Sequence, residues 1–572
     1  MNRVTIPKAF DIVKRGSNHG SLETCTMMSQ NKLDRTYSHE TVYVTASEWR
    51  WVIILGVIFV LLAFTPLILV SLRGTPNWQF MGILHNFQDG ATYFSKMRLG
   101  FIGDWLVQFQ HTSEPQNGAL IQLLYPLLGH FSHLTNLPIA IVFHVVRAIA
   151  ALMMYLSLYY LAAVVWSNIR SRRLFFIIVS VGAGFGWFLA PLLNTIEFPD
   201  FAWIPEAFPF LSSLMNVHFP LTIGCIAILA SLLILILRPG AETDPALSWT
   251  PLSIAILSIF ISVLYPQALV PIGLSLAGIG VLYLLNKKSI PRRFLHAVLA
   301  IGLPALPFAG YYLISVQHDP VLTEWNRQNV TLSPPFLYLL LGFGLPLILA
   351  IPALIRAIRR MEMDGDRFML LWLGATVVLM YLPTNFQRRF AVGIMIPIAY
   401  FAVRGIDQTW IKHVNRKAQR LVAVMLIFVM SISPLFALFL PILPALAGNP
   451  AQVTGIFLPS DYFQAYRAID VLNRPNDVVL ASPVVSTWIP GWTRSRVVYG
   501  HPYETLDADR KLNEVNAWFS GELDADACTA LIEQYSVRYV LVGPEELALG
   551  TPSCTEGMRV VAEFPSVTVY AP

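Results

Sequence analysis

The stretch HNFQDGATYFSKM, residues 85–97, decides how this chain is interpreted, because it places an aspartate directly after a strongly apolar segment. A carboxylate is costly to hold close to lipid. Asp89 therefore belongs either to a solvated loop or to a reactive site. The rest of the sequence has to separate these two interpretations.

The composition is typical of a protein built largely from membrane-spanning helices. Of the 572 residues, 55% are hydrophobic and 13% are charged, whereas soluble proteins carry about 25% charged residues. The net charge of +5 comes from short Lys/Arg clusters between apolar runs rather than from a continuous basic face. The sequence therefore predicts an α-helical polytopic membrane protein and no nucleic-acid partner.

Eleven apolar segments approach the length of about 20 residues that a membrane-spanning helix needs. They are centred near Ile58, Ala151, Gly184, Ala230, Ile259, Ala277, Leu306, Leu345, Val377, Ile396 and Phe428. The connectors 167–173, 286–293, 356–367 and 404–420 carry 3, 4, 4 and 5 Lys/Arg residues, so the positive-inside rule places all four in the cytoplasm. An odd number of spans then puts the N-terminus inside and the C-terminal residues outside.

These segments divide the chain into three parts. Residues 1–48 are polar and lack the apolar run of a cleavable signal peptide, so we expect a loosely ordered cytoplasmic tail. Residues 49–447 form the transmembrane region, with a first outer loop at 72–136. In residues 448–572, strand-length apolar runs alternate with helical patterns, which predicts a small extracytoplasmic α/β domain. Its expected elements are helices at 461–472 and 508–535, strands at 477–481, 496–499 and 538–542, and a hairpin at 560–570.

Two short patterns need an explanation of their own. Cys528 and Cys554 both fall in the exported part, where a disulfide between them could persist, whereas Cys25 falls on the cytoplasmic side. The run Gly182-Ala-Gly-Phe-Gly186 resembles a nucleotide-binding fingerprint, but it lies inside a predicted span. Close packing of helices is therefore the better explanation for these glycines.

The first outer loop is predicted to hold two helices on the membrane surface, joined by polar turns. In residues 87–101 apolar side chains recur every three or four positions, which indicates an amphipathic helix. Its polar face carries Asp89, Thr92, Tyr93 and Lys96. Asp89 and Lys96 are two turns apart, or about 10 Å along the axis. The second apolar stretch, 119–134, contains a proline and is too short to span.

Several cations lie where the sequence rules disfavour them. Arg388 and Arg389 fall between two short apolar segments on the outer side, and their planar donors fit a phosphate or pyrophosphate. The alternative is that they anchor helix ends. Arg147 lies inside an apolar run, where a lone charge costs about 2.5–3.5 kcal/mol, so we expect a buried acidic or phosphate partner. Lys96 is a further candidate for contact with an anion.

These features together resemble the GT-C superfamily of integral-membrane glycosyltransferases. The resemblance is carried by Asp89-Gly-x-x-Tyr93, Gly103-Asp104-Trp105, the Glu114-Pro115 turn, Gln387-Arg388-Arg389 and the exported C-terminal domain. It implies a polyprenyl-phosphate-sugar donor used at the outer face, as in mannosyltransferase-like members, and an acidic catalytic residue in the first outer loop, which here matches Asp89. The paired Asp-Glu and the His-Pro-Pro stretch of protein mannosyltransferases are missing, which leaves the sugar, the acceptor and the use of a metal open.

The sequence therefore predicts transfer of a hexosyl or pentosyl group from the lipid carrier to a glycan, lipid or protein acceptor in the cell envelope. Asp89 is the expected general base, with Asp104 and Glu114 as further candidate bases or metal ligands. The alternative for Asp89 is a role in capping or solvating its helix. The secondary or acceptor-side candidates are Tyr93, His111, Asp319, Glu324 and His501. A divalent metal is left open, because the sequence holds no tight metal-binding motif.

Two other functions fit the same outer arginines. A transporter or flippase would move an anionic lipid or a lipid-linked sugar, and a non-catalytic assembly protein would act through the exported domain. Transporters usually show two related halves with binding groups near the middle of the membrane. In this sequence no repeat is detected, and the polar residues gather in the outer loops, which favours the transferase.

Overall fold

The structure is a computed structural model that describes residues 43–572, apart from gaps at 239, 288, 361–363, 441–442, 444–446, 448–452, 454 and 473. Most of the predicted N-terminal tail (1–48), with Cys25, lies outside the described residues, and so does the predicted start of the C-terminal domain at 448.

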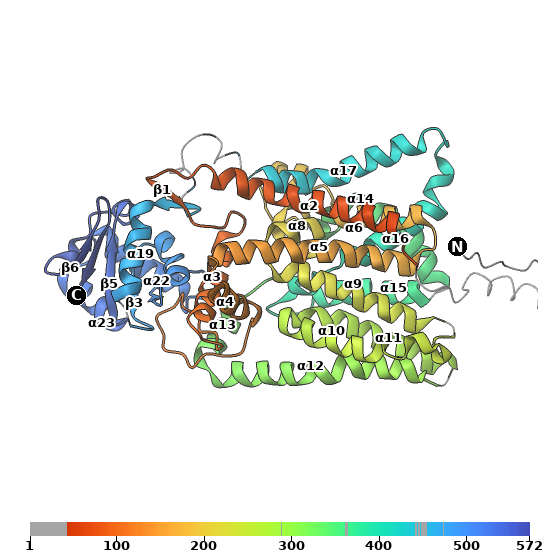
Figure 1. The fold of residues 1–572 in the computed structure, drawn as a ribbon, viewed down its shortest axis with the longest axis horizontal. Coiled ribbons are helices and arrows are strands. Elements are labelled where there is room, and N and C mark those ends of the chain that lie inside the picture. Colours follow the sequence, from red (N-terminus) through yellow and green to blue (C-terminus); the bar gives the residue numbers. More distant parts are fainter. Residues whose placement is uncertain are drawn as a thin grey trace, which may run out of the picture. The chain divides into compact units, whose positions relative to one another are not determined.

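The membrane region consists of helices that run side by side (Figure 1). In the described residues, eight helical segments are long and apolar enough to cross a membrane. They are α2 (Ala46–Ser71), α5 (Ile139–Val165), the pair α6 and α7 (Ile169–Val181 and Gly186–Leu193), α9 (His218–Leu237), the segment Pro266–Asn286 with α11 (Leu269–Lys287), α12 (Arg292–His318), α14 (Phe336–Arg360) and α17 (Gln419–Phe439). Three shorter helices, α10 (Thr250–Leu264), α15 (Asp364–Met380) and α16 (Met395–Gln408), occupy the other predicted segments. The polytopic α-helical fold is confirmed.

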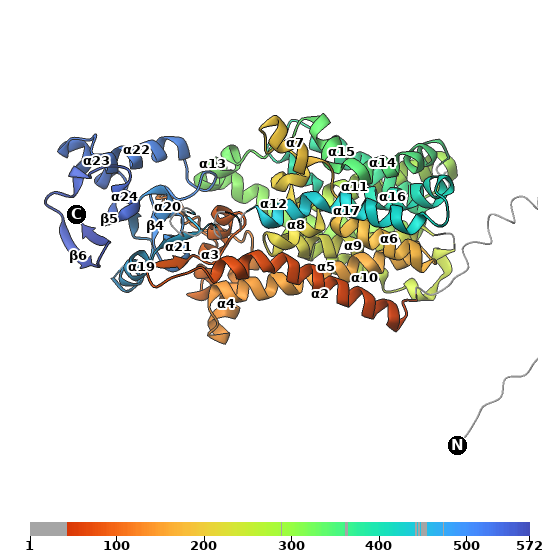
Figure 2. The same ribbon diagram turned by 90° about the horizontal axis from the view of Figure 1, so that it is seen from above.

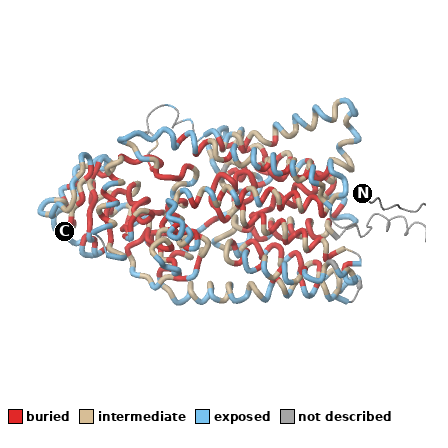
Figure 3. The backbone as a smooth tube through the Cα atoms, in the orientation of Figure 1, coloured by how far each residue is buried: buried red, intermediate tan, exposed pale blue. Residues whose placement is uncertain are grey.

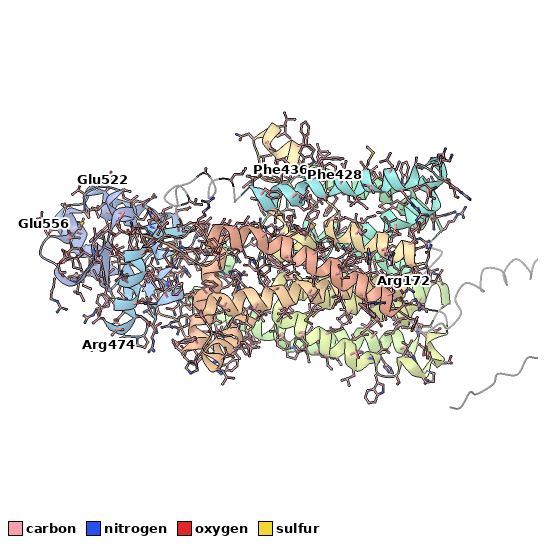
Figure 4. All side chains as sticks on the ribbon, turned by 45° about the horizontal axis from the view of Figure 1, so that its top comes forward. Arg172, Phe428, Phe436, Arg474, Glu522 and Glu556 are labelled. Atoms are coloured by element: carbon pink, nitrogen blue, oxygen red, sulfur yellow. A yellow bond between two sulfur atoms is a disulfide. The ribbon has the colours of Figure 1, made fainter. Side chains whose placement is uncertain are left out.

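The helix α2 begins at Ala46 rather than at residue 49, because the sequence Thr45-x-x-Glu48 forms a capping box. Glu48 is buried, and its carboxylate also accepts hydrogen bonds from Tyr159 at 2.8 Å and from Arg172 at 2.9 Å. Arg172 lies at the end of the helices that faces away from the C-terminal sheet (Figure 4). The four basic connectors all lie at this same end (Figure 1).

The glycine run 182–186 lies within the span Ile169–Leu193, as the sequence predicted, and the helix breaks there. The helix α6 ends at Val181, and α7 begins at Gly186. The freed backbone N–H groups of Gly184 and Gly186 donate to the buried carboxylate of Asp200 at 3.1 and 3.0 Å. The close helix packing predicted for these glycines is present, because a Cβ on Gly184 would collide with the backbone of α14 at Leu341.

The C-terminal part contains a five-stranded mixed sheet with the strand order β4-β3-β5-β7-β6. The strands are β3 (Val478–Leu480), β4 (Arg496–Val497), β5 (Val537–Val542), β6 (Arg559–Glu563) and β7 (Thr568–Ala571). The helices are α19 (Ser460–Leu472), α20 (Pro483–Ser486), α21 (Ile489–Trp492), α22 (Ala508–Ser520), α23 (Ala525–Gln534) and α24 (Pro544–Leu547). This confirms the predicted α/β fold. The single helical stretch expected at 508–535 is two helices, because Gly521 adopts a left-handed conformation with φ +81°.

The first outer loop and the C-terminal part share one core, which the sequence did not predict. Strand β1 (Trp78–Phe80) pairs antiparallel with β2 (Phe457–Pro459). The helices α3 (Phe87–Phe101), α4 (Leu124–Thr135) and α13 (Pro320–Gln328) lie between the membrane helices and the C-terminal sheet (Figures 1 and 2). The helix α3 has the predicted bounds.

The apolar face of α3 contacts protein rather than covering a membrane surface, which corrects the second half of that prediction. Phe94 is buried and packs edge-on against Phe143 and at a tilt against Trp488 of the C-terminal part. Figure 3 shows buried backbone continuing through this region. Lys96 is buried as well. The reason is that the C-terminal part covers α3, so the face predicted to meet water meets protein.

The outer edge of the membrane region differs in character from the C-terminal part. Phe428 and Phe436 lie exposed on α17, as expected for side chains that face lipid, whereas the side chains labelled on the C-terminal part are Arg474, Glu522 and Glu556 (Figure 4). This contrast separates a lipid-facing region from a water-facing one.

Candidate active site

Asp89 lies in the first turn of α3, next to a residue whose backbone conformation is unusual. Asn86, which precedes the helix, has φ 49° and ψ 53°, in the left-handed region that asparagine tolerates better than most residues. Its side-chain amide donates to Asp89 Oδ2 at 2.6 Å. The Asp89 side chain keeps 40% of its surface exposed. The carboxylate is thus held on one side and open on another.

The second partner of Asp89 comes from the C-terminal part. His501 Nε2 lies 3.1 Å from Asp89 Oδ1. On the other side of the same ring, Nδ1 accepts the backbone N–H groups of Tyr503 at 3.1 Å and of Glu504 at 3.2 Å. An imidazole nitrogen that accepts two hydrogen bonds carries no proton, so the proton is on Nε2 and is donated to Asp89.

These contacts keep Asp89 ionised. Burial alone raises the pKa of Asp89, but the hydrogen bonds from His501 and Asn86 oppose it, so the pKa lies below its ordinary value. The negative charge of Glu504 acts in the opposite sense, with a smaller effect. In the described part of the chain, both carboxylate oxygens bond to side chains and no backbone N–H donates to them. The hydrogen bond from a backbone N–H to the Asp89 carboxylate that a helix-capping role requires is therefore not formed among these residues.

Lys96 and His111 do not face an open site, which corrects both sequence predictions. Lys96 Nζ lies 2.5 Å from Glu504 Oε1, and both side chains are buried. His111 is also buried, with Nδ1 3.6 Å from Glu504 Oε2 and Nε2 3.0 Å from the Thr487 carbonyl oxygen. Burial raises the pKa of Glu504, but the charge of Lys96 and the contact with His111 outweigh it and hold the pKa well below its usual range. Lys96 is neutralised by this partner and is not a free cation.

Glu114 and Asp104 lie apart from the contacts around Asp89. Glu114 pairs with Lys511 of the C-terminal part and accepts a hydrogen bond from Thr112. Asp104 is exposed in the turn after α3. Neither carboxylate contacts Asp89 or its partners in the described residues, so neither shares its site.

Asp319 and Glu324 have local roles around α13. Asp319 accepts the backbone N–H groups of Val321 at 2.8 Å and Leu322 at 3.1 Å, as the residue that caps this helix. Glu324 forms an exposed ion pair with Arg327 one turn away. The structure thus explains both residues without a substrate.

Arg388 and Arg389 lie in the short turn of helix η7 (Gln387–Ala391). Arg388 stacks over the Trp203 ring and donates to the Trp203 carbonyl oxygen at 3.3 Å. Arg389 donates to Asn329 Oδ1 at 3.0 Å. Among the residues described in the structure, neither guanidinium forms an ion pair, and both are half-buried. Two cations without a carboxylate partner in this setting can accept an anion.

Arg147 has partners of a different kind from those predicted. Its Nη1 donates to the carbonyl oxygens of Leu214 at 2.5 Å and Met215 at 3.1 Å, at the C-terminus of α8 (Pro209–Leu214). Its guanidinium also lies over the Phe64 ring, 4.4 Å from the centroid. No carboxylate pairs with Arg147 in the described part of the chain. The carbonyl groups at a helix C-terminus carry partial negative charge, which stabilises the arginine instead.

A row of contacts begins at Tyr93, near Asp89 on α3, and ends at Glu206. Tyr93, one turn after Asp89, stacks on Tyr125 with centroids 4.1 Å apart, and the Tyr125 hydroxyl lies 2.6 Å from His218 Nδ1. His218 stacks on Tyr265, whose hydroxyl donates to the buried Glu206 at 3.4 Å. Tyr93 and Asp89 are thus the near end of a row of polar aromatic side chains.

Electrostatic effects at both ends of this row agree with the contacts. Burial raises the pKa of Glu206, and the nearby charges of Arg388 and Arg389 oppose that rise. Burial and the charge of Asp89 raise the pKa of Tyr93 well above its ordinary value, whereas the charge of Arg389 lowers it. The charges of both Asp89 and Arg389 therefore act on Tyr93.

Four residues in this row or next to it were not predicted from the sequence as site residues. They are Asn86, Tyr125, His218 and Tyr265. A signal was present for two of them, because His218 and Tyr265 each stand at the end of an apolar run that otherwise lacks polar aromatic residues. Their convergence depends on helix packing and leaves no mark on local periodicity.

Two further features concern the sequence predictions on metal and disulfide. In the described residues, no group of three or more His, Cys, Asp or Glu side chains is arranged to hold a metal ion. Cys528 and Cys554 are joined by a disulfide, with Cα atoms 5.4 Å apart.

Comparison with known proteins identifies the fold. No family model and no curated protein matches this chain. Its structure is similar to that of ArnT from Cupriavidus metallidurans bound to undecaprenyl phosphate, with 15% sequence identity, a TM-score of 0.51, and coverage of 92% of this chain and 98% of that one. The apo state of the same protein gives 15% identity, a TM-score of 0.52 and coverage of 90% and 97%.

An archaeal structure shows the same likeness. The Archaeoglobus fulgidus oligosaccharyltransferase in complex with Zn and sulfate has 11% identity and a TM-score of 0.50, and the alignment covers 91% of this chain and 73% of that one. At these identities the likeness establishes architecture. The chain therefore has the fold of the GT-C glycosyltransferases, as its sequence predicted.

Proposed function

We propose that this protein is a membrane glycosyltransferase that moves a hexosyl or pentosyl group from a polyprenyl-phosphate donor to an acceptor hydroxyl at the outer face of the membrane. The observation that carries the proposal is the row of contacts that begins at Tyr93, one turn after Asp89, and runs through Tyr125, His218 and Tyr265 to Glu206. The charge of Asp89 acts on Tyr93, and the charges of Arg388 and Arg389 act on Glu206, which supports one site shared by the carboxylate and the two cations. Undecaprenyl phosphate bound to ArnT, which shares this fold, is consistent with such a donor.

The reaction assigns one role to each end of the row. The acceptor oxygen forms a bond to the anomeric carbon, and the bond from that carbon to the phosphate oxygen breaks. The acceptor proton passes to Asp89, whose lowered pKa keeps it ionised before the step. The phosphate leaves with the electron pair, and the charges of Arg388 and Arg389 stabilise it there. General-base help of this kind is worth about 10²–10⁴-fold in rate.

The orientation in the membrane belongs to the same proposal. The four basic connectors lie at the end of the helices opposite the C-terminal sheet (Figure 1). The positive-inside rule then places the N-terminus in the cytoplasm and the candidate active site, together with the C-terminal part, outside. A lipid-linked donor presented at the outer surface would meet Asp89 from the membrane side, and the acceptor would be a glycan, a lipid or a protein.

The test compares two aspartates of the first outer loop. The purified chain, in liposomes, is given a panel of polyprenyl-phosphate hexoses and pentoses with envelope extract as acceptor, and release of polyprenyl phosphate is measured. Asp89→Asn should lower turnover by about 10²-fold or more while donor binding is nearly kept. Asp104→Asn, which changes an exposed carboxylate outside the site, should leave turnover close to that of the wild type.

The result that counts against the proposal is also specific. A folded Asp89→Asn protein that still releases polyprenyl phosphate at the wild-type rate would remove Asp89 from the reaction. If no donor is consumed by the wild type but lipid-linked sugar crosses the bilayer, the protein is a transporter of such lipids instead.

A further inference from the structure

One loop of the C-terminal part contacts α3 at two points. This loop, residues 500–506, is here named the His501 loop. His501 reaches Asp89, and Glu504 reaches Lys96. Asp89 and Lys96 are two helical turns apart, about 10 Å along the axis. The loop therefore lies along the helix that carries the candidate base, instead of touching it at a single point.

The His501 loop is held in place from three directions. Within the loop, Thr505 Oγ1 accepts the backbone N–H groups of Gly500 and His501, both at 3.1 Å. The same hydroxyl donates to the His111 carbonyl oxygen at 2.6 Å, which ties the loop to the first outer loop. From α13, Gln328 Nε2 donates to the carbonyl oxygens of Tyr503 at 2.9 Å and Thr505 at 2.6 Å. The His501 ring thus has little freedom to move away from Asp89.

The ring presents one proton, and that proton is directed at Asp89. The backbone N–H groups of Tyr503 and Glu504 occupy Nδ1, which leaves Nε2 as the donor. The His501 side chain is only 4% exposed, whereas that of Asp89 is 40% exposed. The histidine thus binds the covered side of the carboxylate, and the open side stays free for another molecule.

We infer that His501 is a positioning residue that holds the Asp89 carboxylate oriented and ionised, so that the C-terminal domain supplies part of the active site itself. This inference deepens the proposed function, since it assigns His501 a purpose in the step at Asp89. The contact, however, can be tested whether or not Asp89 is the base. A donor N–H on Oδ1 stabilises the negative charge and limits rotation of the carboxyl group, while the remaining lone pairs are available to an acceptor hydroxyl.

Other charged and titratable groups also act on Asp89 or respond to it, and they have to stay unchanged in the test. Glu504 in the His501 loop acts on Asp89, and Tyr93 on α3, Tyr125 on α4 and His218 on α9 respond to it. Lys96 on α3 and Arg389 in η7 act in turn on His218. Among the described residues, His501 and Asn86 are the side chains with hydrogen bonds to the Asp89 carboxylate. A variant of His501 therefore removes one of two direct partners.

Two substitutions separate the donor from the shape of the loop. His501→Asn keeps a carbonyl oxygen close enough to accept the N–H groups of Tyr503 and Glu504, but its amide is too short to reach Asp89. His501→Gln extends an amide N–H to the position of Nε2 and gives up the acceptor at Nδ1. His501→Asn therefore removes the donor to Asp89 and keeps the acceptor for the loop N–H groups. His501→Gln keeps the donor and removes the acceptor.

The measurement is the rate at which Asp89 reacts with a water-soluble carbodiimide and glycine ethyl ester at pH 5, quantified by peptide mass spectrometry on the full chain in detergent. The carboxyl oxygen of Asp89 adds to the central carbon of the carbodiimide, and one proton passes to a carbodiimide nitrogen, so at fixed pH the rate rises with the protonated fraction of Asp89. Loss of a charge-assisted hydrogen bond raises the carboxyl pKa, and the expected increase in rate is about tenfold. We expect that increase in His501→Asn and a rate within about threefold of the wild type in His501→Gln, by the same reasoning.

A matched control breaks another contact between the same two regions. Asp470 of α19 pairs with Arg98 of α3 at 2.7 Å, away from Asp89. Asp470→Asn should leave the carbodiimide rate of Asp89 unchanged. Size-exclusion chromatography and thermal unfolding of each variant show that the chain is folded.

The outcomes are decisive in both directions. An unchanged rate in His501→Asn overturns the inference, and so does an equal increase in both His501 variants, because that would assign the effect to loop shape. If His501→Asn does not fold, the contact is tested from the other side with Asp89→Asn in histidine-labelled protein. The ¹⁵N resonance of His501 Nε2 should then shift, and an unchanged resonance overturns the contact. If Asp89→Asn remains an active transferase while the carbodiimide result holds, the proposed base is wrong and the positioning contact is still correct.

Discussion

Lys96 and Glu504 form a buried ion pair, with Nζ 2.5 Å from Oε1, between a helix of the first outer loop and a loop of the C-terminal part. Removal of one partner from a buried pair leaves an uncompensated charge, which typically costs about 3–5 kcal/mol. We therefore expect Lys96→Met to lower the stability of the C-terminal part by about that amount. The double variant Lys96→Met, Glu504→Leu should recover much of the loss. Thermal unfolding measures this, and a single variant as stable as the wild type would contradict it.

The same pair makes stability depend on pH. The pKa of Glu504 is held well below its usual range in the folded protein. Its stabilising effect is therefore present above the ordinary pKa of a glutamate, about 4.3, and is lost as the pH falls below that value. Unfolding temperatures recorded from pH 7 to pH 3 should decline below about pH 4. In the double variant the same decline should be smaller, and an equal decline would assign it to other carboxylates.

The activity of the proposed enzyme should have no acid limb from Asp89 near neutral pH. The pKa of Asp89 lies below its ordinary value, so the base stays ionised at every pH above about 4. We expect kcat/KM to be constant on the acid side from pH 7 down to about pH 5. A fall in kcat/KM between pH 7 and pH 6 would contradict this prediction if it persists when each of the other carboxylates is replaced. It would show that the base has a higher pKa.

Donor binding should depend on Arg388 and Arg389. Each charge-assisted hydrogen bond contributes about 1.5–3 kcal/mol, so Arg388→Gln with Arg389→Gln should weaken donor affinity by about 10²-fold or more and leave the fold intact. Lysine at both positions should restore part of it, because an ammonium lacks the planar fork of arginine. Arg327→Gln, which changes an exposed arginine paired with Glu324, is the matched control. Unchanged donor affinity in the double variant would leave these arginines as anchors of helix ends.

The disulfide can be tested without any substrate. Cys528 and Cys554 are 26 positions apart in the sequence, and closing a loop of that size contributes about 3 kcal/mol in the chain-entropy model. Intact protein purified without reductant should resist alkylation at both cysteines. Reduction or Cys554→Ser should lower the unfolding temperature of the C-terminal part. Two alkylated thiols under non-reducing conditions would contradict the pairing.

The orientation can be tested by reporter fusions. A periplasmic-type reporter joined after residue 450 should be active, and the same reporter placed in the basic connector near Asn415 should be inactive. The reverse pattern would put the candidate site on the cytoplasmic side and exclude an outer donor.

The sequence by itself determined the features that depend on local periodicity. Eleven apolar segments were placed where the described part of the chain has eight long helical segments and three shorter helices. The amphipathic repeat of 87–101 located α3 with its observed bounds, and the alternation of short apolar runs located the C-terminal strands. These successes have one physical reason, because a helix or a strand repeats its contacts every few residues and marks its own sequence.

Tertiary structure decided which polar groups meet. His501 and Asp89 are 412 positions apart, and Lys96 and Glu504 are 408 apart. Lys96 was predicted to contact an anionic ligand, and in the structure it is buried against the carboxylate of Glu504 from the C-terminal part. Arg147 was expected to have an acidic or phosphate partner, and in the structure helix-end carbonyl groups accept its hydrogen bonds. A buried charge requires a partner, but many groups can serve as that partner, and only packing between distant segments selects one.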